Sequence, residues 1–423
     1  MEQSVTRQKI PRVAVVHDWL TVFGGAERVL AEILDIWPQA DVYSVIEFLS
    51  EDDRKFLRGK PVHTSFLQKW PFARKSYRAY LPLMALAVEQ FDLSSYDLVI
   101  SSSFAVAKGV ITGPDQVHVS YVHSPIRYAW DLQHQYLNVS GLERGIKSWM
   151  ARLMLHYVRM WDYRTAHGVD LFVANSNFIS RRIRKVYGRS AVVVYPPVDV
   201  SRFTMWEKKE EFYMTASRLV EYKKVSLIVR AFSQMPSKRL VVIGDGPDLA
   251  SIRAIATPNV EVLGYLPTPG LIDHMRRARA FVFAAEEDFG ITPVEAQACG
   301  TPVIAYGKGG ALETVIADGD NRTGVFFDAQ TEESIVSAVM RFEDDKEPIT
   351  AQACRSNAER FGPKIFRQSL ASIVDQMMNR PAAPMTMFGK RKSDSANVPG
   401  LFVASSASVA ERKDVAKLWK VAE

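Results

Sequence analysis

The sequence predicts an α/β fold in which two similar Rossmann-like domains face each other across a cleft. Short apolar runs recur along the chain, and segments of helical length separate many of them. A stretch rich in proline and charge divides these runs into two series. Strands that alternate with helices form mostly parallel sheets, and such sheets bind ligands at the carboxyl ends of their strands.

The first series begins with the apolar run at 12–17, a Gly-Gly pair and a helical pattern that includes Val29, Leu30 and Ile33. This order predicts a strand, a glycine loop and a helix. Further strands are expected at 40–46, 96–103, 118–123, 171–176 and 191–198.

One long helix is expected at about 144–167. Its apolar residues form two adjacent stripes at helical spacing. The stripes consist of Met150, Met154 and Val158, and of Trp149, Leu153, Tyr157 and Trp161. A face this wide is expected to lie in the core.

A linker is expected where two prolines and a charge run follow Tyr195. The second series of strands is then expected at 212–219, 239–247, 260–266, 280–285, 302–306 and 324–327. The predicted organisation is an amino-terminal domain at 10–203, a carboxy-terminal domain at 204–365, a closing helix at 366–380 that packs on the first domain, and a disordered tail at 381–423 rich in Pro, Ala and Ser.

The composition is that of an ordinary globular protein, with 47% hydrophobic and 24% charged residues. Cys299 and Cys354 are too few and too far apart for a disulfide framework or a thiolate metal site, so a core role in a reducing compartment is expected. We expect neither a secretory signal nor a membrane span, which needs about 20 apolar residues. The net charge of +6 and the pI of 9.1 admit nucleic acid, a lipid surface or a phosphorylated small molecule as partner.

The segment at 70–88 interleaves basic and aromatic residues. Arg74, Lys75 and Arg78 stand among Trp70, Phe72, Tyr77 and Tyr80. This pattern suits the surface of an anionic leaflet, and it equally suits a solvated basic helix end beside a core helix.

The stretch at 280–300 predicts a buried strand, a polar turn and a helix. Thr292, Pro293 and Glu295 fit the N-cap, first and third positions of a capping box. Alternatively, Glu295 accepts hydrogen bonds from a ribose diol. Glu287, on the loop itself, has no capping role, and a carboxylate followed by a glycine suggests recognition of hydroxyl groups.

Other candidates follow strands of either series. Arg218 and Lys223 stand just past the strand at 212–219, where two cations can bind a diphosphate. The IGDGP turn at 243–247 either brings backbone close to a ligand or is a plain tight turn. The DGD at 318–320 indicates a turn. In the first domain, His17, His123 and Arg127 fall near strand ends on one side, without the spacing of metal ligands.

Together these residues resemble the retaining glycosyltransferases of family 4, which have the two-domain GT-B fold. The specific part is Glu287 and Glu295 in an E-x7-E spacing. An R-x4-K spacing, the IGDGP turn, the GTPVIAYGKGGALETV run and the Gly24-Gly25 loop support it, and the resemblance extends to about residue 370. The segments HDWLTVFGGAERVL and YVHSPIRYAWDLQHQYL are similar to bacterial mannosyltransferases that build surface polysaccharides.

The resemblance implies a role for each matching residue. Glu295 would hold the ribose and Glu287 the hydroxyls of the donor sugar, while Arg218 and Lys223 would bind the diphosphate. His123 would contact the transferred sugar. The remaining donor-binding residues would be Gly24, Gly25, Gly244, Phe289, Gly290 and Ile291, and the acceptor-side candidates are His17, Asp18 and Arg127.

The implied reaction moves a hexose, most simply mannose from GDP-mannose, to a lipid-linked oligosaccharide in exopolysaccharide, capsule or O-antigen synthesis. No metal or other cofactor is expected, and neither is nucleic acid. The acceptor would carry polyprenyl diphosphate, which places the protein in the cytoplasm at the inner face of the plasma membrane. Alternatives are a UDP-hexose donor, a nucleotide-sugar epimerase or hydrolase on the same fold, a nucleic-acid binder, and a sugar sensor without catalysis.

Overall fold

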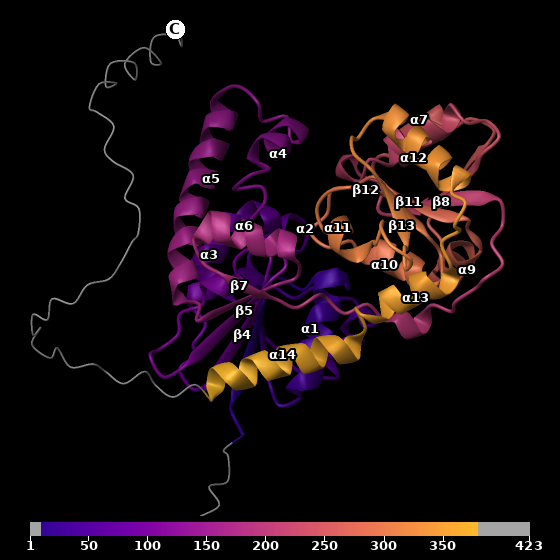
Figure 1. The fold of residues 1–423 in the computed structure, drawn as a ribbon. Helices are drawn as coiled ribbons and strands as arrows, with labels where there is room; N and C mark the ends of the chain where they lie inside the picture. The colour runs from indigo at the N-terminus through magenta and orange to yellow at the C-terminus, as the bar shows by residue number, and fades with distance from the viewer. Residues whose placement is uncertain (1–9, 380–423) are drawn as a thin grey trace, which may run out of the picture. The chain divides into compact units, whose positions relative to one another are not determined.

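The protein forms two parallel sheets covered by helices, as seen in a computed structural model that describes residues 10–379 (Figure 1). The expectation for the tail at 381–423 lies outside the described residues. The first sheet has seven strands in the order β3-β2-β1-β4-β5-β6-β7, and the second has six in the order β10-β9-β8-β11-β12-β13. Every pairing is parallel, which confirms the predicted α/β fold.

The first sheet contains the expected strands and one short strand that the sequence did not indicate, β3. Its strands are β1 (Val13–His17), β2 (Asp41–Ser44), β3 (Val62–Thr64), β4 (Leu98–Ser103), β5 (Val117–Val122), β6 (Leu171–Ala174) and β7 (Ala191–Val193). β1 and β4 are buried along their whole length, because helices cover both faces of the sheet. In their register, His17 lies opposite Ser102.

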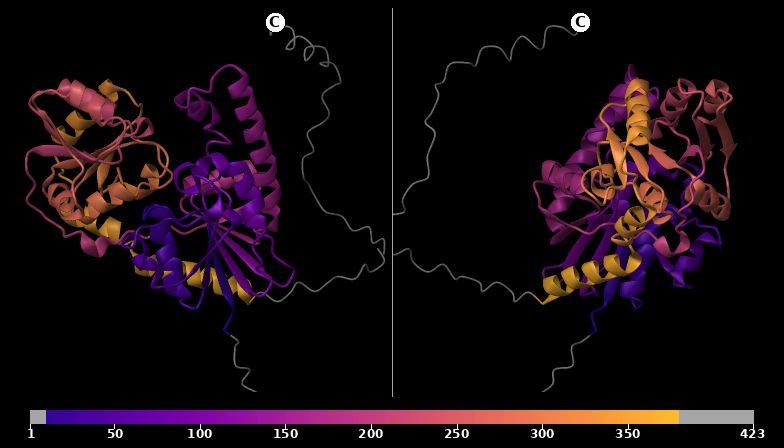
Figure 2. Two further views of the ribbon diagram at one scale, coloured as in Figure 1. Left: turned by 180° about the vertical axis from the view of Figure 1, so that it is seen from behind. Right: turned by 45° about the vertical axis from the view of Figure 1, so that its right-hand side comes forward.

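Helices from both ends of the chain cover this sheet. They are α1 (Gly25–Ile36), α2 (Ala73–Ser76), α3 (Leu81–Glu89), α4 (Gln133–Val139), α5 (Ile146–Thr165), α6 (Asn177–Tyr187) and α14 (Pro363–Met378). α14 lies against α1 and β5, which is visible from two directions (Figure 2). Its Phe366, Leu370 and Val374 join the core of the first domain, and Arg367 forms an ion pair with Glu32.

The second sheet follows the linker. Its strands are β8 (Phe212–Ala216), β9 (Arg239–Ile243), β10 (Val260–Gly264), β11 (Ala280–Phe283), β12 (Val303–Tyr306) and β13 (Gly324–Phe327). Its helices are α7 (Val225–Ser233), α8 (Leu249–Ile255), α9 (Thr268–Arg277), α10 (Ile291–Ala298), α11 (Ala311–Thr314), α12 (Glu332–Asp344) and α13 (Ala351–Glu359). Both cysteines are free and buried here, as predicted, and 318–320 forms a turn.

The structure contradicts one expectation about packing. Helix α5 was predicted to bury its wide apolar face, but Trp149, Met150 and Leu153 are exposed. Only Val158 and Trp161 of the two predicted stripes are buried. The periodic pattern correctly indicated a helix, and it did not reveal that most of this face has no neighbouring element among the described residues.

Candidate active site

Four loops of the second sheet meet at one edge, because their strands are neighbours. The sheet places β9, β8, β11 and β12 side by side in that order. The loops that follow them, at 244–247, 217–224, 286–290 and 307–310, therefore share the carboxyl end of the sheet. Most donor-binding residues that the sequence indicated lie in these loops.

Glu287 and Lys223 form an ion pair at this edge. Burial, and then the charge of Arg127, lower the pKa of Lys223 to about 8. Arg218 comes from the same loop as Lys223 and is exposed, and its guanidinium has no hydrogen-bond or ion-pair partner within residues 10–379. The edge therefore brings together a carboxylate paired with a cation and, from the loop of that cation, a second cation that is exposed.

Glycines fix this arrangement by letting loops pack on each other. Gly244 has φ +143°, and a Cβ there would lie 1.9 Å from the carbonyl oxygen of Ser217. A Cβ on Gly246 would lie 2.3 Å from the carbonyl oxygen of Leu219. The IGDGP turn thus packs against the loop that carries Arg218. The close backbone contact that its glycines permit is therefore with this neighbouring loop of the protein.

The loop that carries Glu287 is held in the same way from its other side. Gly310 donates its backbone N–H to the Glu287 carbonyl oxygen at 2.7 Å. A Cβ on Gly309 would lie 2.4 Å from that oxygen, and one on Gly310 would lie 2.3 Å from the Cα of Phe289. Neither glycine was predicted to have a role of its own, although the GKGG run at 307–310 is a signal for such a close contact.

Helix α10 begins earlier than the sequence indicated. Its N-cap is Gly290, at φ +87°, and Thr292 lies inside the helix, so the predicted capping box is wrong. Glu295 instead accepts a hydrogen bond from Arg28 of α1 at 2.9 Å. A Cβ on Gly25 would meet Ile291 at 3.1 Å, which places the start of α1 against the start of α10.

Phe289 contributes only its backbone to this edge. Its ring is buried and packs 5.7 Å from the ring of Tyr195 and 5.3 Å from that of Phe361. The side chain therefore anchors the Glu287 loop in the core of the second domain.

The first sheet contributes a chain of polar side chains from three neighbouring strands. His17 is the last residue of β1, Ser102 is the second-last residue of β4, and His123 directly follows β5. Ser102 Oγ lies 2.9 Å from His123 Nε2 and 3.1 Å from His17 Nδ1. His17 Nε2 lies 3.4 Å from Glu27, whose carboxylate accepts the N–H of Gly24 at 2.9 Å. This series of polar contacts thus links His123 to the glycine loop at Gly24.

The pKa values of two groups in this series, His123 and Glu27, are both lowered. Burial, and then the neighbouring His17, lower the pKa of His123 to about 3, so its imidazole is neutral near pH 7. Burial raises the pKa of Glu27, but the hydrogen bond and charge of His17 outweigh it, and the net pKa is lowered. His123 therefore offers a neutral hydrogen-bonding group at this edge.

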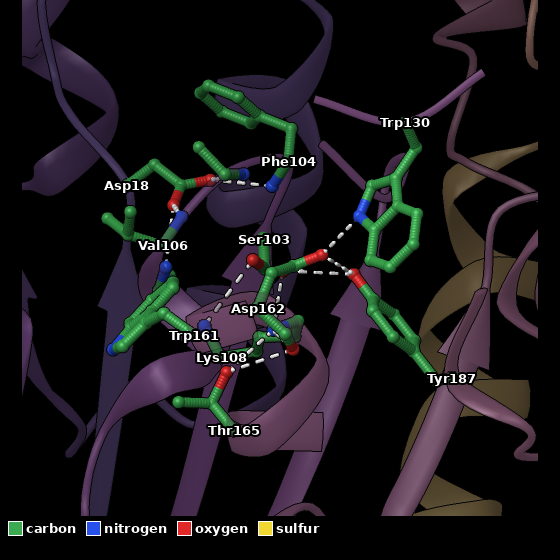
Figure 3. Close-up of polar contacts among 12 residues, drawn as sticks. Asp18, Ser103, Phe104, Val106, Lys108, Trp130, Trp161, Asp162, Thr165 and Tyr187 are labelled. Carbon is green, nitrogen blue, oxygen red and sulfur yellow. Dashed lines mark hydrogen bonds and ion pairs between the residues drawn. The ribbon is translucent and has the colours of Figure 1, made fainter. Parts of the chain in front are cut away.

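Asp18 lies in the core, although the sequence placed it among the acceptor-side candidates. Its side chain is fully buried, and its two oxygens accept the backbone N–H groups of Phe104, Ala105, Val106 and Ala107 (Figure 3). Burial raises the pKa of this carboxyl despite these bonds. The carboxylate holds the loop after β4, which is a structural task.

Contacts between the two sheet domains combine the predicted Arg127 with residues that were not predicted to have a role. Asp288 lies between Arg127 at 3.3 Å and Arg182 at 3.1 Å. Glu313 of α11 accepts the N–H groups of Asn177 and Phe178 at 2.7 and 2.8 Å, at the start of α6. Arg127, an acceptor-side candidate, therefore takes part in an ion pair between the domains.

The geometry suits a ligand that carries both hydroxyl groups and a diphosphate. Glu287 and Glu295 are acceptors for hydroxyl groups, and Lys223 and Arg218 are donors for phosphate oxygens. Within residues 10–379, no three His, Cys, Asp or Glu side chains are grouped so that they could hold a metal ion.

Comparisons with known families match nearly all of the described chain. The family described as "Glycosyltransferase Family 4" matches residues 23–202, and "Glycosyl transferases group 1" matches residues 200–361. These two ranges correspond to the two sheet domains.

Curated relatives include mannosyltransferases. A GDP-mannose-dependent monoacylated alpha-(1-6)-phosphatidylinositol monomannoside mannosyltransferase from Corynebacterium glutamicum is 33% identical over 178 residues, which cover 35% of this chain and 47% of that protein. A GDP-mannose-dependent alpha-(1-6)-phosphatidylinositol monomannoside mannosyltransferase from Mycolicibacterium smegmatis is 28% identical over 217 residues, covering 44% of this chain and 56% of the relative. The chain thus spans about half the length of these relatives.

Solved structures share the fold. The Anabaena protein Alr3699/HepE in complex with UDP has a TM-score of 0.61 at 18% identity, covering 86% of this chain and all of the other. Sucrose-phosphate synthase from Thermosynechococcus elongatus has a TM-score of 0.62 at 16% identity, covering 86% and 99%. With its two parallel sheets and the two matched ranges, this chain belongs to glycosyltransferase family 4 and has the GT-B fold.

Proposed function

We propose that this protein is a retaining hexosyltransferase that transfers mannose from GDP-mannose to an acceptor hydroxyl group. One observation carries the proposal: the Glu287–Lys223 ion pair lies at the carboxyl edge of the second sheet together with Arg218, which has no side-chain partner within residues 10–379. The choice of GDP-mannose is supported by two of the curated relatives, which are GDP-mannose-dependent mannosyltransferases.

Each residue has a defined task in this proposal. Glu295 holds the ribose once it releases Arg28, and Glu287 holds hydroxyl groups of the donor sugar. Lys223 and Arg218 bind the diphosphate and stabilise the charge that develops on it as it leaves. The start of α1 at Gly25 approaches the same phosphates, and neutral His123 accepts or donates a hydrogen bond at the transferred sugar.

We infer that transfer occurs on one face of the sugar. A double displacement needs a carboxylate on the far face, and we assign none to that position. The bond from the anomeric carbon to the diphosphate breaks as the acceptor oxygen bonds to that carbon, and the departing phosphate takes the acceptor proton. The two cations supply the positive charge that a metal ion supplies elsewhere, so we expect no cofactor.

The proposed acceptor is an oligosaccharide linked to polyprenyl diphosphate, met at the cytoplasmic face of the membrane during surface-polysaccharide synthesis. Among residues 10–379, no helix has the length and apolar character needed to cross a bilayer. The segment at 70–88 supports contact with a leaflet at its start, where Trp70, Phe72, Arg74 and Lys75 are exposed. The last part of the segment is largely buried in the core, where Met84, Ala87 and Val88 lie.

A donor screen tests the proposal. Purified protein is mixed with GDP-mannose, GDP-fucose, UDP-glucose, UDP-galactose or UDP-N-acetylglucosamine in EDTA, and thermal stabilisation and release of nucleoside diphosphate are followed. Stabilisation and slow release with GDP-mannose alone is the expected result. A response to a UDP-sugar would contradict the donor, and turnover without any acceptor at the full rate would favour an epimerase or hydrolase.

The variant Glu287→Gln tests the site itself. We expect the rate of transfer to fall at least about 100-fold. A neutral amide accepts hydrogen bonds from the sugar hydroxyl groups more weakly than the carboxylate does, and it does not pair with the charge of Lys223. The neighbouring Glu286→Gln is the matched control, because Glu286 is exposed on the same loop. Initial rates with GDP-mannose measure both, and full turnover by Glu287→Gln would remove this residue from the mechanism.

A further inference from the structure

Helix α5 has an apolar face that no described element covers. We define the outer α5 face as Ile146, Trp149, Met150, Leu153, Tyr157 and Met160, whose exposed fractions run from 48% to 81%. These positions repeat at intervals of three and four residues, so they lie along one side of the helix. A continuous exposed patch of large apolar side chains marks an interaction surface.

The opposite side of α5 is firmly fixed. Asp162 is fully buried and pairs with Lys108 at 2.7 Å, and its other oxygen accepts the N–H of Trp130 at 2.7 Å and the hydroxyl of Tyr187 at 3.1 Å (Figure 3). Lys108 also donates to Thr165 at the end of the helix at 2.8 Å. Because this network holds the helix from behind, the exposure of the outer α5 face belongs to the docked helix.

The charges around the outer α5 face are mainly positive. The exposed Lys147 lies in its first turn, Arg152 and Arg159 are half-buried, and the only acid within α5 is the buried Asp162. In the preceding loop, one exposed acid, Glu143, stands beside the exposed Arg144. An apolar stripe with a cationic border complements an anionic and apolar partner.

The basic and aromatic segment at 70–80 leads into α3, and α3 contacts α5. The segment contains Arg74, Lys75 and Arg78 and no acidic residue. Leu81, which follows it directly, packs in one cluster with Leu155 and Val158 of α5. A second segment with exposed basic side chains, Arg74, Lys75 and Arg78, thus belongs to the domain that carries the outer α5 face.

We propose that the outer α5 face docks on the surface of an anionic lipid bilayer. A Trp, a Tyr and long aliphatic side chains flanked by lysine and arginine are the composition of helices that lie in the headgroup region. A second copy would bring no exposed acidic side chain of α5 to pair with these basic residues, because the one acid of α5, Asp162, is buried. The inference rests on the proposed function for its purpose, since a lipid-linked acceptor is met at a membrane.

Vesicle flotation of the full chain tests this surface without any donor. The probes are vesicles of phosphatidylcholine alone, and of equal parts phosphatidylcholine and phosphatidylglycerol. The double variant Trp149→Glu/Leu153→Glu is expected to partition at least about tenfold more weakly than wild type onto the anionic vesicles. Its control is Met340→Glu/Ile365→Glu, which adds the same charge at two comparably exposed apolar residues elsewhere and should stay within about twofold of wild type.

Each other outcome would overturn the proposal. Wild type that does not float, or an α5 variant that floats as well as wild type, excludes the surface. Equal binding to neutral vesicles excludes the anionic lipid. A loss of dimer mass in the α5 variant, measured by light scattering, assigns the face to a second copy. Release of nucleoside diphosphate from GDP-mannose, followed on the same samples, should be unchanged in both variants, so a failed donor screen and a failed flotation are separate results.

Discussion

The carboxylates of the candidate site are each satisfied by a cation of the same chain. Glu287 pairs with Lys223, and Glu295 with Arg28. A buried or half-buried charge is costly without a partner, so each pair offsets the desolvation of both members. A ligand with hydroxyl groups and phosphates replaces both partners at once: its hydroxyl groups bind the carboxylates and its phosphates bind the cations. Each charged side chain of these two pairs would thus have a polar partner with or without the ligand.

Lys223 makes donor binding depend on pH. Its pKa of about 8 means that it loses its charge above that pH, while a bound diphosphate favours the charged form. The dissociation constant for GDP-mannose should be constant below pH 8 and rise up to about tenfold per pH unit above it. Calorimetric titration across this range measures the effect. In Lys223→Arg the rise should vanish, because arginine keeps its charge; the same slope in that variant would assign the titration to another group.

At the scale of elements, an amphipathic pattern predicts that one face of a helix is apolar. It does not predict which other element packs on that face. α14 and α5 illustrate the two outcomes. α14 buries Phe366, Leu370 and Val374 against the first domain, whereas α5 leaves most of its apolar face exposed. The difference arises from the neighbours: α1 and β5 lie against α14, while α5 contacts the domain through its other side.

The docking of α14 predicts unequal effects of two substitutions on one helix. Leu370 is fully buried and Ile365 is 46% exposed. Leu370→Ala should cost about 3 kcal/mol, because it leaves a cavity between α14 and the first domain, and should lower the melting temperature by about 5 °C or more. Ile365→Ala should change it by less than about 2 °C. Calorimetry measures both, and equal shifts would contradict the packing of α14 described above.

At the scale of the whole molecule, charged groups within residues 10–379 join the two sheet domains at three places. They are Arg28 with Glu295, Asp288 with Arg127 and Arg182, and Glu313 with the first turn of α6. The last contact uses the unpaired N–H groups and the positive end of a helix, which together favour a carboxylate. These contacts set the relation between the two loop edges that carry the candidate site.

Removing the charge of Glu313 should loosen one of these contacts selectively. In Glu313→Gln, the amides of Asn177 and Phe178 lose a charged acceptor, a bond worth about 1.5–3 kcal/mol. Their hydrogen exchange should speed up about tenfold, with the rest of α6 unchanged. Glu333→Gln, at an exposed position of α12, should leave these amides as in wild type. Acceleration along the whole of α6 would instead indicate unfolding of the helix.

Local patterns by themselves determined the two parallel sheets, the linker between them and the loops that hold the candidate site. The strand ends were visible because buried parallel strands are short apolar runs bounded by polar or glycine residues. Glu287, Lys223 and Arg218 were identified because each lies at or shortly after the end of such a run and because their spacing resembles the motifs of the family. The short strand β3 was missed, since Val62–Thr64 has no apolar run to indicate it.

Only the tertiary structure decided which of these residues meet. The Glu287–Lys223 pair joins loops 64 positions apart in the chain, and Arg28–Glu295 joins the two domains. The structure also shows that Asp18 lies in the core, that Thr292 is not the N-cap of α10, and that most of the apolar face of α5 is exposed. The physical reason is common to all of these: burial and ion pairing depend on groups that are distant in sequence, whereas periodicity and turn chemistry depend on near neighbours.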